Sequence, residues 1–177
     1  MFFNTNDKKP PIRSVIPSTL LNWRHTQHCT IFFAYFRHFN TFPINMRLDL
    51  RNIADFAKFK DTYSQRIRNH CQRSDDTGCL VWKRCVRKGY GAIKVSYTEN
   101  NGSKCIITTS PHKVLYMCIY DIQYIEENVE CSHLCGNKLC CEATHIVIES
   151  SSKNHERNTC HKDGFCSKQH RPLCIIH

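Results

Sequence analysis

The sequence predicts a small α+β domain. Three observations predict it: residues 47–70 show the period of an amphipathic helix, residues 79–109 alternate short β-type runs with turn signals, and residues 131–174 concentrate cysteine and histidine. The last segment is too polar to fold alone, so we expect bound metal to stabilise it. A length of 177 residues suits one compact domain with an appended arm.

The N-terminal part divides from the rest by composition. Residues 1–43 are expected to form an arm, mobile in its first eighteen residues, and residues 44–177 the folded domain. Residues 20–42 interleave aromatic and basic side chains, which suits stacking on nucleic acid but fits an ordinary helix or strand face better. The most apolar run, residues 31–36, is far shorter than the ~20 residues of a membrane-spanning helix, so no membrane partner is expected.

Residues 47–70 are predicted to form a helix that covers a sheet. Ile53, Phe56, Phe59, Tyr63 and Ile67 recur at three- and four-residue spacing, with charged residues between them. The polar run at residues 74–78 ends the segment as a turn.

Residues 79–97 are predicted to form a basic β-hairpin, in which runs at 80–83 and 92–97 are joined through residues 88–91. A turn at residues 100–102 then leads into a strand at 105–109, and Pro111 suits the first turn of a short helix at 112–120. The hairpin carries a group of basic residues suited to phosphates and base edges, although a solvated sheet face would look the same. These residues are Lys83, Arg84, Arg87, Lys88 and Lys94.

The net charge and the cysteine content indicate which kind of binding partner and which cellular compartment to expect. Lys plus Arg number 25 and Asp plus Glu 15, so the formal charge is 25 − 15 = +10. That excess favours a polyphosphate partner, although ordinary basic proteins also reach it. Thirteen cysteines, an odd number, occur without a secretory signal. We therefore expect thiolates on metal in the nucleus or cytoplasm and not a secreted disulfide framework.

The C-terminal cysteines and histidines fall into two groups with the spacing of structural zinc sites, which need four thiolate or imidazole ligands. The second group supplies all four within fifteen residues, namely Cys160, Cys166, His170 and Cys174. His161 is the one alternative to His170 as the histidine ligand of this group.

The first group supplies three ligands, Cys135, Cys140 and His145, and must take a fourth from elsewhere. We prefer Cys79, which follows a turn that could bring its thiolate in. The alternatives are Cys71, Cys85 and Cys105, together with Cys141 inside the motif.

Two polar residues, His133 and Asn154, are needed by neither zinc. His133 precedes Cys135 by two positions, so on an extended segment a metal on Cys135 would help to aim the imidazole. A neutral imidazole can take a proton from water, and an amide oxygen suits Mg²⁺. The pair could hydrolyse a phosphodiester, although most such pairs are ordinary surface or capping residues.

Residues 132–140, Ser-His-Leu-Cys-Gly-Asn-Lys-Leu-Cys, resemble the His-Cys box homing endonucleases, intron-encoded members of the ββα-metal or His-Me finger nucleases. The downstream His145, Asn154, Arg157-Asn158 and Cys160 continue the resemblance, which is close over residues 131–174 and loose back to Cys79. It implies a ββα-metal finger, His133 as general base, Asn154 as ligand of one catalytic Mg²⁺, and two structural zinc ions. It also implies a homodimer that reads double-stranded DNA through a β-sheet.

The expected function is therefore site-specific hydrolysis of double-stranded DNA by a homing endonuclease. The alternative is a zinc-dependent DNA-binding protein whose catalysis is weakened or lost. The family places an arginine upstream of the finger to help stabilise the cleaved phosphate, but this chain has none between Arg87 and Arg157, and Lys104 or His112 would have to substitute for it. A ring-type protein-interaction finger is less favoured because no Cys-x2-Cys pair occurs.

Overall fold

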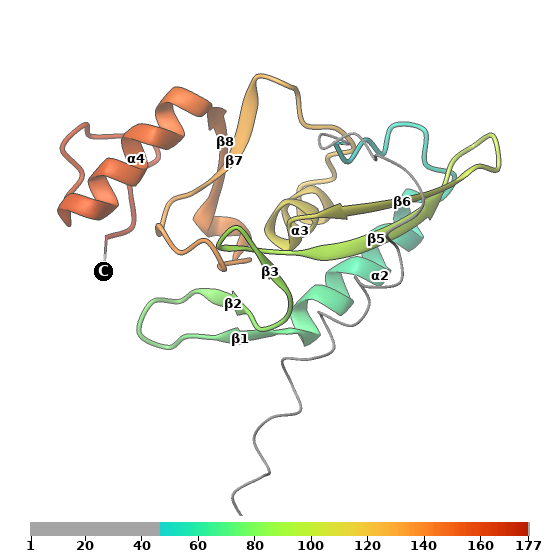
Figure 1. Cartoon of the computed structure of the whole chain (residues 1–177), viewed down its shortest axis with the longest axis horizontal. Helices are drawn as coiled ribbons and strands as arrows, with labels where there is room; N and C mark the ends of the chain where they lie inside the picture. Colours follow the sequence, from blue (N-terminus) through green and yellow to red (C-terminus); the bar gives the residue numbers. More distant parts are fainter. Residues whose placement is uncertain (1–46, 177) are drawn as a thin grey trace, which may run out of the picture. The chain divides into compact units, whose positions relative to one another are not determined.

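The computed structural model describes residues 47–176 (Figure 1). The expected arm and its boundary at residue 43 lie outside them. The elements of the described part, in chain order, are α2 (Phe56–Asn69), β1 (Cys71–Arg73), β2 (Leu80–Trp82), β3 (Val86–Arg87), β4 (Tyr90–Gly91), β5 (Ile93–Thr98), β6 (Lys104–Thr109), α3 (Pro111–Ile119), β7 (Val129–His133), the 3-10 turn η1 (Ala143–His145), β8 (Ile146–Ser150) and α4 (Ser151–Asp163). The mixture of helices with small antiparallel sheets confirms the α+β class.

Helix α2 begins nine residues later than predicted. Asp55 caps it, because its Oδ1 accepts a hydrogen bond of 2.8 Å from the backbone N–H of Lys58. The residues before the cap are not helical, and Leu50 instead donates its N–H to the carbonyl of Gln123. The predicted apolar face is present from Phe59 onward and is buried.

Strands β5 and β6 form the longest hairpin, with Ile93 opposite Thr109 and Thr98 opposite Lys104. Alternation along β5 buries Ile93 and Val95 on one face and exposes Lys94 on the other. Helix α2 covers the outer edge of β5, because the hydroxyl of Tyr63 bonds the backbone N–H and C=O of Ser96.

The single hairpin predicted for residues 79–97 does not form. Strand β2 pairs with β1, which precedes it, and β5 pairs with β6, so the two predicted arms belong to different sheets. Within this stretch only the short β3–β4 hairpin closes, through Lys88 and Gly89 at φ values of 52° and 81°. The other side of β2 is occupied by the loop around Cys140, which bridges to Val81, and this non-local contact overrides the local pairing.

The hydrophobic core lies between α2, α3 and the inner face of β5–β6. Strands β7 and β8 pair antiparallel and α4 follows directly and lies against both, which is the expected ββα order (Figure 1). None of the helices in the described part is long and apolar enough to cross a membrane.

Candidate active site and metal centres

Helix α4 packs against β7 and β8. Three of its side chains with polar groups, at positions i, i+3 and i+6, lie on the face toward these strands. Asn154 lies in the first turns, Arg157 is fully buried in the middle, and Cys160 is buried near the end. Ser150 caps the helix by accepting from the N–H of Lys153. This spacing lets one helix present an amide, a guanidinium and a thiol to the two strands before it.

Four residues from three separate segments converge beside β2: Cys79, Cys135, Cys140 and His145. Their ligand atoms all lie within 4.8 Å of one another. His145 Nδ1 is 3.6 Å from Cys79 Sγ and 3.7 Å from Cys140 Sγ. A zinc tetrahedron with Zn–S bonds of about 2.3 Å has edges of about 3.8 Å, so the arrangement fits.

Cys160, Cys166, His170 and Cys174 converge at the end of α4, again within 4.8 Å. The Nδ1 atom of His170 lies 3.4 Å from Cys174 Sγ, 3.5 Å from Cys166 Sγ and 3.8 Å from Cys160 Sγ. Its Nε2 lies 3.3 Å from a carboxylate oxygen of Glu156. A carboxylate holding the far nitrogen is the usual support of a zinc-bound imidazole.

His161 and Cys141, the two other candidate ligands within the C-terminal segment, lie outside the two tetrads. The ring of His161 lies so close to Gly136 that a Cβ built there would be 2.6 Å from the ring, which places this ring beside the first tetrad and not in the second. The thiol of Cys141 instead lies 3.9 Å from the backbone carbonyl of Leu139, and Cys141 belongs to neither tetrad. The two Cys/His tetrads fit two structural zinc ions.

His133, at the end of β7, is buried with its Nε2 3.1 Å from the backbone carbonyl of Cys140. A carbonyl can only accept, so Nε2 must carry the hydrogen and donate, which leaves Nδ1 as the nitrogen with a free lone pair. Burial lowers the pKa of His133 to about 4, so the imidazole is neutral near pH 7. Because Cys140 is also a member of the first tetrad, the same loop supplies candidate zinc ligands and fixes the tautomer.

Three further side chains lie around His133, and none of them was placed there from the sequence. The ring of His112, at the start of α3, meets it edge-on with centroids 4.4 Å apart, and the ring of Tyr90 lies 6.1 Å away. Burial lowers the pKa of His112 well below its usual range, so it too is neutral. Lys138, which is exposed, places its Nζ 5.3 Å from the centre of the Tyr90 ring.

Asn154 meets two residues of β7. Its Oδ1 accepts a hydrogen bond of 2.8 Å from the hydroxyl of Ser132, and its Nδ2 donates one of 2.6 Å to Glu130. Among residues 47–176 no hydrogen bond joins Asn154 directly to His133. Ser132, the residue before His133, links the helix to the strand that carries the imidazole.

A family model described as the zinc-binding loop region of homing endonuclease matches residues 78–177. The matched stretch contains both tetrads, and it covers more than half of the chain. The chain belongs to the His-Cys box homing endonuclease family. Neither the curated proteins nor the solved structures contain a match to it. Membership of this homing endonuclease family implies nuclease activity in general, and it implies DNA binding.

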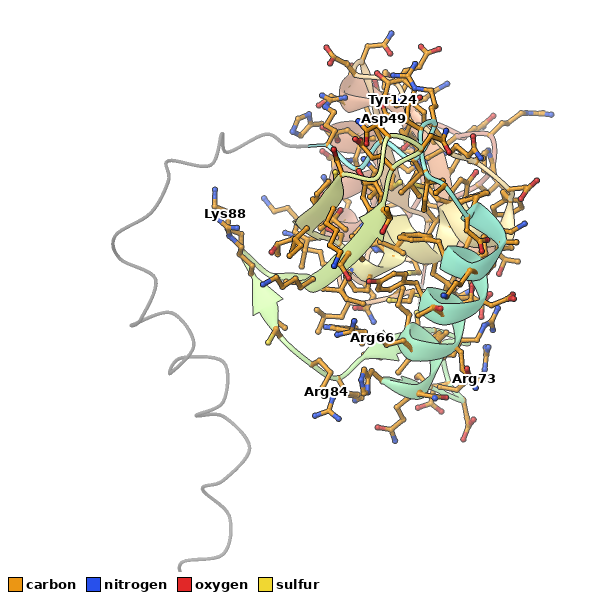
Figure 2. All side chains as sticks on the ribbon, turned by 90° about the vertical axis from the view of Figure 1, so that its right-hand side faces the viewer. Asp49, Arg66, Arg73, Arg84, Lys88 and Tyr124 are labelled. Atoms are coloured by element: carbon orange, nitrogen blue, oxygen red, sulfur yellow. The ribbon has the colours of Figure 1, made fainter. Side chains whose placement is uncertain are left out.

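The basic residues predicted to meet DNA are all exposed in this protein. Lys88 occupies the projecting tip of the β3–β4 hairpin, and Arg84 points outward from the segment that leads into it (Figure 2). Within the described part of the chain, the predicted set forms no ion pair with a carboxylate. Its exposed members are Lys83, Arg84, Arg87, Lys88 and Lys94.

A buried ion pair fastens α4 to β8. Arg157 Nε lies 2.8 Å and 3.0 Å from the two carboxylate oxygens of Glu149, and its Nη1 lies 3.4 Å from Cys174 Sγ. Its Nη2 is buried without a hydrogen-bond partner. The pair thus joins the second tetrad to the strands, at the cost of desolvating a charge.

We expect Arg157→Met to destabilise the zinc-loaded protein by about 3–5 kcal/mol, because Glu149 would be left buried and unpaired. The double variant Arg157→Met with Glu149→Leu removes both charges and should be markedly more stable than the single variant. Urea unfolding followed by circular dichroism measures both. Equal stability of the single variant and the wild type would show that the pair does not hold α4 in place.

Proposed function

We propose that this protein is a site-specific endonuclease that hydrolyses phosphodiester bonds of double-stranded DNA with His133 as general base. The observation that carries the proposal is the hydrogen bond from His133 Nε2 to the Cys140 carbonyl. It presents a neutral Nδ1 that can accept a proton from water. The water oxygen attacks phosphorus as His133 takes its proton, the bond from phosphorus to the 3′ oxygen breaks, and the 3′ oxygen takes a proton from solvent, so the products are a 5′-phosphate and a 3′-hydroxyl.

Asn154 is proposed to hold one Mg²⁺. Its Oδ1 is a hard oxygen donor with a second lone pair beyond the one that accepts from Ser132. Bound Mg²⁺ supplies positive charge that stabilises the pentavalent phosphate and the leaving 3′ oxygen. Asn154 would hold that positive charge on the side of β7 that faces α4. The proposed base, His133, is itself a residue of β7.

Lys138 is proposed to supply part of the positive charge that the family obtains from an upstream arginine. It is exposed, lies over Tyr90, and its charge adds to the lowering of the pKa of His133 that burial causes. A cation beside the base can stabilise charge that develops on the phosphate. The positive charge of Lys138 would let the nuclease act without an arginine between residues 87 and 157.

The outer face of β5–β6 is proposed to read bases. Alternation and register place an exposed set of side chains on this one face, with Ile106 opposite Ser96 at its centre. Ile106 is 54% exposed, and an apolar side chain at this position of the face suits contact with the methyl group of thymine. The set is Lys94, Ser96, Thr98, Lys104, Ile106 and Thr108.

Two variants on this face should therefore behave differently. Lys94→Ala should weaken binding to all duplexes and reduce the slope of log affinity against log salt by about 0.9 if it removes one phosphate contact. Ile106→Ser should leave that slope unchanged and lose about 1–3 kcal/mol of preference at one base pair. Fluorescence anisotropy at several salt concentrations separates the two effects. A uniform loss of affinity in Ile106→Ser would contradict base reading.

Two copies of the chain are proposed to act on one site, as the family likeness suggests. Each copy carries one proposed base and one proposed Mg²⁺ ligand, so cleavage of both strands needs two such centres. Sedimentation of the zinc-loaded protein with a duplex that holds its site should give two protomers per duplex.

The proposal is tested by incubating zinc-loaded protein with a randomised duplex library and Mg²⁺, then sequencing the cut ends. We expect cuts at one discrete site that need Mg²⁺. Binding with no cleavage at any Mg²⁺ concentration would overturn the nuclease and leave a zinc-dependent DNA-binding protein.

A further inference from the structure

We propose that Glu130 is a positioning residue for Asn154, fixing the side-chain amide so that its oxygen faces the cation site. The inference rests on the proposed function, because it assumes that Asn154 holds a divalent cation.

The hydrogen bonds around Asn154 determine which way its amide points. Nδ2 donates to Glu130 Oε2 over 2.6 Å, and Oδ1 accepts from the Ser132 hydroxyl over 2.8 Å. A hydroxyl can donate or accept, so Ser132 alone would tolerate either orientation of the amide. An ionised carboxylate can only accept, so Glu130 forces the nitrogen toward itself and the oxygen away.

The positions of these residues on β7 and α4 explain how Glu130 can orient the amide of Asn154. Glu130 and Ser132 are two residues apart on β7, so both point to the face of the strand that α4 covers. Asn154 is the fourth residue of α4 and faces both of them. One strand and one helix therefore supply the whole arrangement.

The negative charge of Glu130 is not neutralised by an ion pair with any residue that the structure describes, so it can act on the amide of Asn154. Glu149 lies directly opposite it on β8, but the carboxylate of Glu149 is paired with Arg157. Within residues 47–176 no lysine, arginine or histidine forms an ion pair with Glu130. A carboxylate that accepts from the amide nitrogen polarises the amide and increases the negative charge on its oxygen, which strengthens that oxygen as a ligand.

Mn²⁺ titration of zinc-loaded full-length protein, followed by NMR, tests the inference without relying on cleavage. The paramagnetic ion broadens the side-chain amide signals of a residue that it binds, even when binding is weak. Loss of a supporting partner of a metal ligand typically costs about 10–100-fold in metal affinity. We therefore expect Glu130→Ala to raise the Mn²⁺ concentration that half-broadens the Asn154 signals by about that factor. Thermal unfolding checks that each variant is folded.

A double variant distinguishes positioning from direct coordination. If Glu130 acts only through Asn154, adding Glu130→Ala to Asn154→Ala should not raise further the Mn²⁺ concentration that half-broadens the backbone amide signal of Ser132, whereas loss of a direct ligand would raise it. Glu127→Gln removes the same charge at an exposed position three residues away and should leave the midpoint unchanged.

Three results would overturn the inference. Equal midpoints in wild type and Glu130→Ala would show that Glu130 has no role, and a further loss when Glu130→Ala is added to Asn154→Ala would make it a ligand and not a positioning residue. Absence of broadening at Asn154 in the wild type would remove the Mg²⁺ assignment itself. The last result counts against the proposed function as well, whereas the first two count against Glu130 alone.

Discussion

Replacing His133 by glutamine is expected to lower the single-turnover rate of DNA cleavage by about 10²–10⁴-fold while leaving DNA affinity nearly unchanged. Glutamine can place an N–H near the position of Nε2 and so keep the hydrogen bond to the Cys140 carbonyl. It has no basic nitrogen to replace Nδ1. The substitution therefore removes the base with little disturbance of the loop.

His155→Ala is the matched control for this experiment. His155 lies exposed on α4, close in sequence to Asn154, and has no described side-chain contact. Its substitution should leave cleavage unchanged. Rates are compared by quenched flow on the duplex selected from the library, with anisotropy for affinity. A His133→Gln variant that cleaves at the wild-type rate would mean that another group activates the water.

Removal of zinc is expected to unfold the C-terminal half of the protein. Structural zinc contributes about 10–16 kcal/mol of apparent binding energy, comparable with or larger than the total stability of about 5–15 kcal/mol of a typical domain. The first tetrad joins Cys79 at the start of β2 to the loop that carries Cys135 and Cys140, and the second closes the chain after α4. Chelation should therefore disorder α4 and abolish the hydrogen bond that orients His133.

Single ligand variants separate the two sites. Cys79→Ser and Cys166→Ser should each reduce the zinc content from two ions to one by native mass spectrometry and lower the melting temperature. Cys105→Ser, which changes a half-buried cysteine outside both tetrads, should retain two zinc ions. Metal-free protein that still unfolds in one cooperative transition at the wild-type temperature would contradict the metal-dependent fold.

Much of the metal chemistry was predictable because it is local in sequence. Cys160, Cys166, His170 and Cys174 lie within one helix end and one loop, so spacing alone groups them. The short helix after Ser110 was also predicted, because a proline marks its start. Strand pairing was not predictable, because β2 is held by the loop around Cys140, some sixty residues away.

The surroundings of His133 and Asn154 could not be predicted for the same reason. His112 and Tyr90 come from different elements, and only the packing of α3 and β4 against β7 brings them to the imidazole. Glu130 did leave a signal, since it alternates with Ser132 just before the histidine. That alternation acquires meaning only once α4 is known to place Asn154 above this face of β7.

The central claim is that water, activated beside His133, hydrolyses the DNA backbone. It is tested most directly by cleaving the selected duplex with wild-type protein and Mg²⁺ in ¹⁸O-labelled water, followed by mass spectrometry of the new ends. We predict one ¹⁸O atom in each 5′-phosphate, with an unlabelled 3′-hydroxyl on the other fragment. A protein that leaves the duplex intact, or ends that carry a 3′-phosphate or a 5′-phosphate without label, would contradict the mechanism.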